Sequence, residues 1–183
     1  MPEAPQLPAW CRIDANLAVA KIQIRDVPDA CDQLASTIGV QPPRPNRWVA
    51  RHGLALTAVA PGEWLLTGNA DDVAAALERA EAAFRAQAIL ALDLTHGCVV
   101  LRLDGAAGRS CLAALCPLDL RPEHFTVGAA ARTRFGDIGV FVAHLGDAPA
   151  FLLIADQSNA PYVLHLIARS AIVADHNRDE IRS

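Results

Sequence analysis

Arginines are the side chains of this sequence best suited to binding a charged group, and they gather in two segments. Arg44, Arg47 and Arg51 lie in and just after a proline-rich stretch, whereas Arg132 and Arg134 alternate along a predicted strand. A guanidinium group binds carboxylates and phosphates through paired hydrogen bonds, and alternate residues of a strand point to the same side. These arginines could therefore hold an anion or the acidic surface of a partner. A solvated strand face is the alternative.

Two aspartates, Asp93 and Asp119, stand between leucines. A carboxylate in such a setting either has a raised pKa that suits it to proton transfer or accepts hydrogen bonds from the backbone of a turn. We favour the turn-capping role for both residues, because short acidic side chains readily bond to nearby backbone groups.

The segment Gly105-Ala-Ala-Gly108 follows a predicted strand and begins a predicted helix. It could place a phosphate at the helix N-terminus, but the third glycine of the dinucleotide-binding fingerprint is missing. We favour the alternative, in which small residues let the helix pack closely on a sheet. The sequence also lacks a P-loop, a nucleophile-elbow serine and a Cys-x-x-Cys pair, and its histidines are scattered. We therefore assign no catalytic residue and no metal site, and we leave cofactor-binding residues unassigned.

The composition describes a globular chain. Its 183 residues are 52% hydrophobic and 20% charged, which excludes a disordered chain of low hydrophobicity. No apolar run approaches the roughly 20 residues of a membrane-spanning helix. The formal net charge of −4 lacks the basic excess typical of nucleic-acid-binding proteins. We predict neither a nucleic-acid nor a membrane partner.

The cysteines and the N-terminal segment bear on the compartment. Five cysteines, an odd number without paired spacing, favour a reducing environment over a disulfide framework. Residues 1–8 contain neither the basic nor the apolar region of a signal peptide. We predict a cytoplasmic protein.

The same order of patterns occurs twice along the chain. An alternating strand over residues 22–26 precedes a helix in the first half, and a strand over residues 101–104 precedes a helix in the second. Each half continues with short extended runs and ends in an amphipathic helix, over residues 69–88 and 158–173 respectively.

This repeat predicts an α+β fold of two ferredoxin-like split βαβ halves related by internal duplication, with antiparallel sheets and helices packed on one side. We assign residues 1–18 to a mobile N-terminal arm, 19–90 to the first half, 91–174 to the second half and 175–183 to a solvated C-terminal tail. The alternative is that an α+β protein shows such recurrences without a duplication.

Several short motifs between Trp48 and Ala174 follow the pattern of a known family. The motifs are Pro61-Gly-Glu-Trp-Leu-Leu66, Asp93-Leu-Thr-His-Gly97, Leu101-x-Leu-x-Gly105, Leu115-Cys-Pro-Leu-Asp-Leu120, Phe125-x-x-Gly128 and Arg132-Thr133. This set resembles the gamma subunit family of heterotetrameric sarcosine oxidase, which is related to the folate-binding aminomethyltransferase T-protein of glycine cleavage. The chain departs from the family pattern at residues 156–159, where an Arg-Ser pair is expected.

The resemblance implies an accessory gamma subunit in a complex that demethylates sarcosine oxidatively to glycine, with tetrahydrofolate as the one-carbon acceptor. It implies FAD, FMN, NAD, zinc and tetrahydrofolate in the other subunits and none in this chain. The partners would be the alpha, beta and delta subunits, and this chain would support the folate-domain subunit. An isolated chain would then expose apolar surface and could form a homo-oligomer.

The resemblance also singles out the tryptophan of its Glu-Trp-Leu-Leu segment. The partner-interface candidates are therefore Arg44, Arg47, Arg51, Trp64, Arg132 and Arg134. Two other roles remain open for the same kind of fold. One is a stand-alone folate-binding or aminomethyltransferase-like protein, although the chain is shorter than a full transferase. The other is an iron–sulfur repair factor, whose Lys-Gly-Cys-Tyr segment is absent from this sequence.

Overall fold

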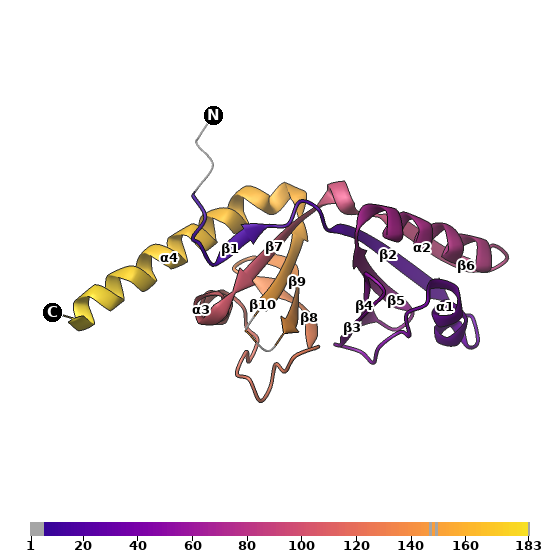
Figure 1. Ribbon diagram of the computed structural model, residues 1–183, viewed down its shortest axis with the longest axis horizontal. Coiled ribbons are helices and arrows are strands. Elements are labelled where there is room, and N and C mark those ends of the chain that lie inside the picture. The colour runs from indigo at the N-terminus through magenta and orange to yellow at the C-terminus, as the bar shows by residue number, and fades with distance from the viewer. Residues whose placement is uncertain (1–5, 147, 149, 183) are drawn as a thin grey trace. The chain divides into compact units, whose positions relative to one another are not determined.

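The computed structural model describes residues 6–146, 148 and 150–182, with residues 172–182 described by their backbone alone. The chain forms two compact units (Figure 1). Unit 1 contains Met1–Asp14, Val99–Val127 and Arg132–Ser183, and unit 2 contains Ala15–Cys98 and Gly128–Ala131. Among the described residues, no helix is both long and apolar enough to cross a membrane.

Unit 2 is built on a five-stranded sheet with the strand order β3-β4-β5-β2-β6. Helix α2 packs across β2, β5 and β6 and against α1 (Figure 1). The elements are β2 (Ala18–Arg25), α1 (Ala30–Ile38), β3 (Trp48–Arg51), β4 (Leu54–Ala60), β5 (Glu63–Gly68), α2 (Ala70–Ala83), β6 (Ala88–Asp93) and the short 3₁₀ helix η1 (Thr95–Gly97).

The strand order of unit 2 confirms the predicted ferredoxin-like half. β2 lies between β5 and β6 and is antiparallel to both, and β4 is antiparallel to β5. Two split βαβ units, β2-α1-β4 and β5-α2-β6, therefore interlock in one antiparallel sheet. β3 forms a hairpin with β4 and adds a fifth strand at the edge.

The core of unit 2 follows from alternation along its strands. Ile22 and Ile24 on β2 are buried, whereas Lys21 and Gln23, which alternate with them, are partly exposed. The buried side chains meet the apolar face of α2 and the fully buried Phe84, which directly follows the helix. A strand with one face against helices and one face open has this period of two.

Unit 1 has a second five-stranded sheet, with the strand order β1-β7-β10-β9-β8. Helices α3 and α4 contact each other and β10. The elements are β1 (Cys11–Ile13), β7 (Cys98–Asp104), α3 (Gly105–Leu115), β8 (Ala130–Phe135), β9 (Ile138–Gly146), β10 (Ala150–Asp156), the 3₁₀ helix η2 (Gln157–Asn159) and α4 (Ala160–Arg182).

The two sheets have equivalent strand orders, β3-β4-β5-β2-β6 and β8-β9-β10-β7-β1, which supports the predicted duplication. The fifth strand, however, has a different origin in each unit. In unit 2 it is β6, which follows α2 in the sequence, whereas in unit 1 it is β1, which comes from the N-terminal end of the chain. The segment predicted as a mobile arm over residues 1–18 thus contains a paired strand.

Four charged side chains form two ion pairs where β1 pairs with β7. Arg12 and Arg102 lie directly opposite each other on the antiparallel pair β1 and β7. Arg102 pairs with Asp14, with 2.6 Å between Nε and Oδ2, and Arg12 pairs with Asp104. The two ion pairs cross the strand pair diagonally, so each arginine of the opposed pair has its own carboxylate. Because like charges placed opposite each other are destabilising, the two aspartates make this register acceptable.

The predicted boundaries differ from those of the units. Residues 91–98 and 128–131 belong to unit 2 and not to the second half, and unit 2 begins at Ala15 and not at residue 19. The first difference arises because β6 pairs with β2. The solvated tail predicted over residues 175–183 falls within α4 as far as Arg182. Its side chains, and Ser183 altogether, lie outside the described residues.

Candidate functional site

Three of the candidate arginines lie at the edge strand β3 of unit 2. Arg44, Arg47 and Arg51 are all exposed. Arg51 donates a hydrogen bond from Nε to Nε2 of His52 at 3.1 Å, and the backbone of Arg47 bridges to Ala129. Of the three, Arg51 lies on β3 itself, and Arg44 and Arg47 lie in the segment that leads into this strand.

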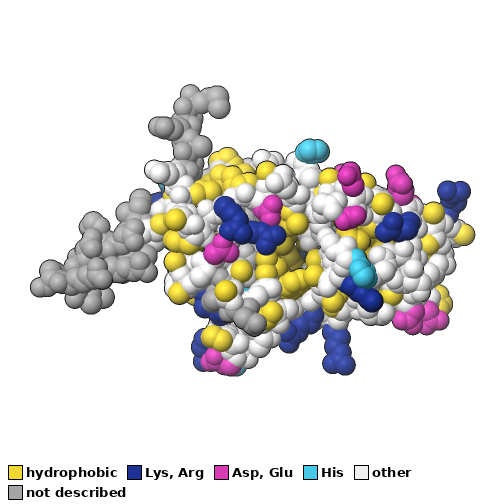
Figure 2. Space-filling model, viewed as in Figure 1, with side chains coloured by type: hydrophobic (Ala, Val, Ile, Leu, Met, Phe, Trp, Pro, Cys, Tyr) yellow, Lys and Arg dark blue, Asp and Glu magenta, His cyan; other side chains and the backbone are white. Residues whose placement is uncertain are grey.

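The other two arginines lie on β8, the edge strand of unit 1. Arg132 and Arg134 are exposed, whereas Phe135 beside them is buried, so the two arginines share an outward face as predicted. Arg134 contacts Asp137, with 3.5 Å between Nη2 and Oδ1, and donates to its carbonyl oxygen at 3.0 Å. On the face of the molecule in Figure 2, basic side chains are interspersed with acidic and hydrophobic ones.

Trp64, the remaining interface candidate, lies in the core of unit 2. It is 3% exposed and belongs to the cluster that contains Ile22 and Leu66. A core position explains the presence of a large apolar side chain here. Its role at an interface stays a prediction.

Asp93 and Asp119 both bond to the backbone of a turn, as we favoured from the sequence. The hydroxyl and the backbone N–H of Thr95 lower the pKa of Asp93, and the backbone bond measures 2.8 Å. Hydrogen bonds from the side chain of Arg121, with Nε at 2.8 Å from Oδ1, lower the pKa of Asp119 well below its usual range. Both carboxyl groups therefore stay ionised near neutral pH, and neither is suited to deliver a proton.

The segment Gly105–Gly108 supports the close-packing interpretation. Gly108 is buried on α3, and a Cβ atom there would lie 2.9 Å from the backbone carbon of Leu103 on β7. Only a residue without a side chain permits this approach of helix to strand.

Unit 1 contains an aromatic cluster that the sequence did not predict. His144 is buried, with its ring stacked between Phe151 at 4.7 Å and Phe125 at 6.3 Å. The guanidinium carbon of Arg109 lies 5.1 Å from the centre of the Phe151 ring, and Arg109 also donates to the carbonyl of Leu120. The Nδ1 atom of His144 lies 2.8 Å from the carbonyl oxygen of Phe125. Because a carbonyl only accepts, Nδ1 carries the proton.

The aromatic cluster connects β9, β10 and α3 with the segment 117–127. Arg109 and His144 each bond to a carbonyl of that segment. The residues of the aromatic cluster come from separate segments of the sequence, and no characteristic spacing relates them. Only the folded chain brings them together.

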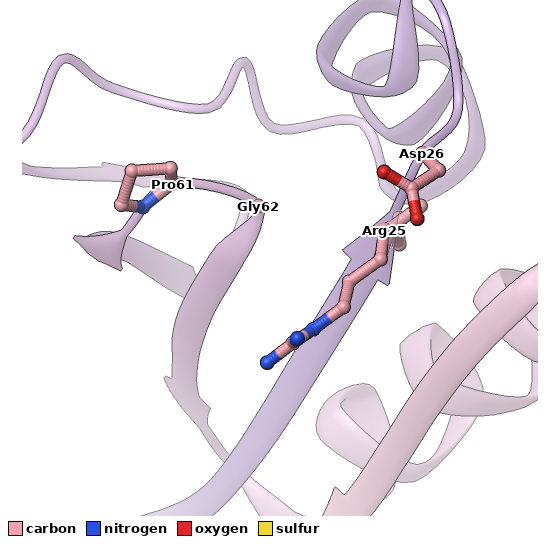
Figure 3. A pocket seen from close by; sticks show the side chains of 5 residues that line it. Arg25, Asp26, Pro61 and Gly62 are labelled. Atoms are coloured by element: carbon pink, nitrogen blue, oxygen red, sulfur yellow. The ribbon is translucent and has the colours of Figure 1, made fainter.

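A shallow pocket of about 520 Å³ lies where β2 ends beside the β4–β5 turn, and Figure 3 shows its lining residues. The Arg25 side chain extends along β2, and its guanidinium group lies away from the Asp26 carboxylate (Figure 3). Pro61 and Gly62 form the opposite wall, where the carbonyl of Gly62 accepts from the backbone N–H of Ile24 at 2.9 Å. None of the interface candidates lines this pocket. Within the described part of the chain, no group of three or more His, Cys, Asp or Glu side chains could hold a metal ion.

The five cysteines differ in accessibility. Cys31 is exposed, whereas burial raises the pKa of Cys11 and of Cys116 to about 12 and also raises the pKa of Cys111. Only the thiolate reacts with disulfide reagents. At pH 8 we therefore expect Cys31 to react fastest with Ellman's reagent, the half-buried Cys98 to react more slowly, and all five thiols to react in denaturant. In C31S the fast phase should disappear and the slower phase should remain. A fast phase of unchanged amplitude in C31S would show that another thiol is as reactive as Cys31.

Two solved structures share this fold. One is described as heterotetrameric sarcosine oxidase from Corynebacterium sp. U-96; a chain of it matches with a TM-score of 0.80 at 24% identity, over 92% of this chain and 88% of that one. The other is the glycine cleavage system aminomethyltransferase T from Bartonella henselae, with a TM-score of 0.64 at 16% identity, over 86% of this chain and 44% of that one. At these identities the likeness shows the class of fold alone, a duplicated α+β fold that this chain shares with both structures.

Sequence comparison identifies the family within this class. The model of the sarcosine oxidase, gamma subunit family matches residues 26–172. The sarcosine oxidase subunit gamma of Corynebacterium sp. (strain U-96) is 31% identical over 131 residues, which cover 69% of this chain. The alignment spans 63% of that relative, less than two thirds of its length. This chain belongs to the sarcosine oxidase gamma subunit family, as the sequence motifs implied.

Proposed function

We propose that this chain is the gamma subunit of a heterotetrameric sarcosine oxidase. The observation that carries the proposal is the family match over residues 26–172, which extends from unit 2 through most of unit 1. The structural likeness over 92% of the chain supports it, because the shared fold includes both halves of the duplication.

In this proposal the complex acts in the cytoplasm and converts sarcosine to glycine, with tetrahydrofolate as the one-carbon acceptor. The alpha, beta and delta subunits carry FAD, FMN, NAD and zinc and bind tetrahydrofolate. This chain supports the subunit with the folate domain and takes no part in the flavin chemistry.

Arginine-lined sheet edges suit such a supporting role. Arg132 and Arg134 on β8, like Arg44, Arg47 and Arg51 at β3, are exposed on their own units. Guanidinium groups bind carboxylates in paired geometry, and a charged edge also prevents pairing with the wrong strand. We assign these edges to acidic surfaces of the partner subunits.

Co-expression with the alpha, beta and delta subunits of the same oxidase tests the proposal. We expect the chain to co-purify with them, and the complex to weaken about tenfold in R132E/R134E, because charge reversal at an interface is repulsive. The matched control is R85E, which reverses an exposed arginine on a different element, just after α2. Failure of the wild-type chain to co-purify would refute the proposed function. Equal assembly of R132E/R134E and R85E would refute only the role of the β8 arginines.

The alternative, a stand-alone folate-binding protein, rests on the fold shared with the aminomethyltransferase. Titration calorimetry of the isolated chain with tetrahydrofolate distinguishes the two. The gamma-subunit proposal expects no binding heat at micromolar concentrations. Saturable heat from this chain alone would favour the alternative.

A further inference from the structure

The two sheets have four edge strands, and β6 differs from the other three. β8 carries Arg132 and Arg134, β3 carries Arg51, and β1 is three residues long and carries Arg12. β6 has the sequence Ala-Ile-Leu-Ala-Leu-Asp, with no charge before its last residue. Charged residues and short strands are the usual means of preventing an edge from pairing. β6 has neither protection.

Backbone groups of β6 point outward in a regular pattern. The N–H of Leu94 donates to the carbonyl of Val19 at 2.8 Å, which fixes the even-numbered residues of β6 as those bonded to β2. The odd-numbered residues therefore direct their backbone away from the sheet. Among these residues, Ile89 already donates its N–H to the carbonyl of Gln87 at 3.0 Å. The N–H groups of Ala91 and Asp93 and the carbonyl of Ala91 therefore point to the outer edge, where another strand could bond to them.

Two leucines of β6 make this edge apolar on one face. Leu90 and Leu92 are 42% and 41% exposed. They lie opposite Gln23 and Lys21 of β2 and thus on the sheet face away from the buried Ile22. Arg25, which lies across from Ala88 on the same sheet face, places a positive charge at one end of this row.

We infer that β6 is a strand-addition site for an extended segment of a partner subunit; the inference rests on the proposed function. The segment would pair its backbone with Ala91 and Asp93, place apolar side chains beside Leu90 and Leu92, and carry an acidic residue toward Arg25. Main-chain bonds give such a contact its affinity, and the alternate side chains give it specificity.

Size favours a partner subunit over a second copy of this chain. A pairing of β6 with itself would involve the six residues of the strand on each side, whereas a stable interface needs roughly 20–30 residues a side. As one part of a larger interface within a heterotetramer, the same six residues are sufficient. The edge therefore fits a subunit that contacts this chain elsewhere as well.

The test uses the double variant L90K/L92K, co-expressed with the alpha, beta and delta subunits. Lysines on an edge strand prevent pairing. Because L92K lies opposite Lys21, where like charges repel each other, the single variant L90K, which lies opposite Gln23, is measured beside the double variant. We expect assembly at least about tenfold weaker than with wild type. The matched control is V127K, because Val127 is 43% exposed and lies in a loop of unit 1. Circular dichroism and thermal unfolding of each purified variant verify that it is folded.

Hydrogen–deuterium exchange of residues 87–95 gives a second readout. We expect fast exchange at Ala91 and Asp93 in the isolated chain and slow exchange in the complex. If wild type assembles but L90K/L92K assembles equally well and these amides stay fast, the inference is wrong and the proposed function stands. If the wild-type chain does not assemble, the proposed function itself fails. Concentration-dependent protection in the isolated chain would instead identify a second copy as the occupant and overturn the inference.

Discussion

Replacing Phe151 with alanine is expected to lower the free energy of unfolding by about 4 kcal/mol, the usual range for a buried phenylalanine. Phe151 is fully buried on β10 between the His144 ring and the guanidinium group of Arg109. The substitution leaves a cavity and removes the aromatic ring that His144 and Arg109 both contact. Urea denaturation followed by circular dichroism measures the change.

The variant Phe151→Leu separates the cavity from the aromatic contact. Leucine fills most of the space, so we expect a loss of about 1–2 kcal/mol, part of which is the stacking contribution. The exposed aromatic of the same unit, Tyr162 at 37% exposure, provides the control. Y162A removes a partly buried ring and the hydrogen bond from the backbone N–H of Asp137, so it should cost only about 1 kcal/mol, well below Phe151→Ala, if burial governs the effect. A Phe151→Ala chain as stable as wild type would show that the cluster does not hold unit 1 together.

Replacing Gly62 with alanine is expected to cost about 3 kcal/mol, because two penalties combine. Gly62 has a φ of +67°, and a Cβ atom there would lie 2.4 Å from the carbonyl oxygen of Ile24. That oxygen belongs to the backbone of β2, so the β4–β5 turn must move away from the strand to which it is bonded. The buried Trp64 reports the unfolding of unit 2 by fluorescence.

Gly39 provides a matched control for this effect. Its φ of +78° is equally unfavourable for alanine, but no atom lies within 4 Å of the position of its Cβ. We expect G39A to cost about 1 kcal/mol, the conformational penalty alone. Equal losses in G39A and G62A would contradict the proposed close approach between the β4–β5 turn and β2.

The order of the elements was predictable, because it depends on patterns within short stretches of sequence. Alternation identified the strand at Ile22 and Ile24, and helical spacing identified α2 with its buried Phe84. The turn roles of Asp93 and Asp119 followed from residue type in the same way, since each bonds to a residue two positions on. Local chemistry determines all of these.

Features that join distant segments were not predictable. β1 has only three residues, too few to show a period, and its pairing with β7 depends on Arg102 and Asp14, which are far apart in the sequence. The aromatic cluster around His144 is similar, because no spacing relates its members. The burial of Trp64 also depends on tertiary structure, because alternation along β5 does not tell which face the helices cover.

The N-terminal strand that completes the sheet of unit 1 has a consequence for the order of folding. β1 and β7 must meet although all of β2 through β6 lies between them in the sequence, and closing so long a loop costs entropy and slows folding. Unit 2 shortens that loop, because the bond between Leu94 and Val19 holds its two ends together. Unit 2 should thus fold first during synthesis, as soon as β6 leaves the ribosome. Once folded, it shortens the loop that must close before β1 can pair with β7. A substitution that loosens unit 2, such as G62A, would then delay the folding of unit 1 as well.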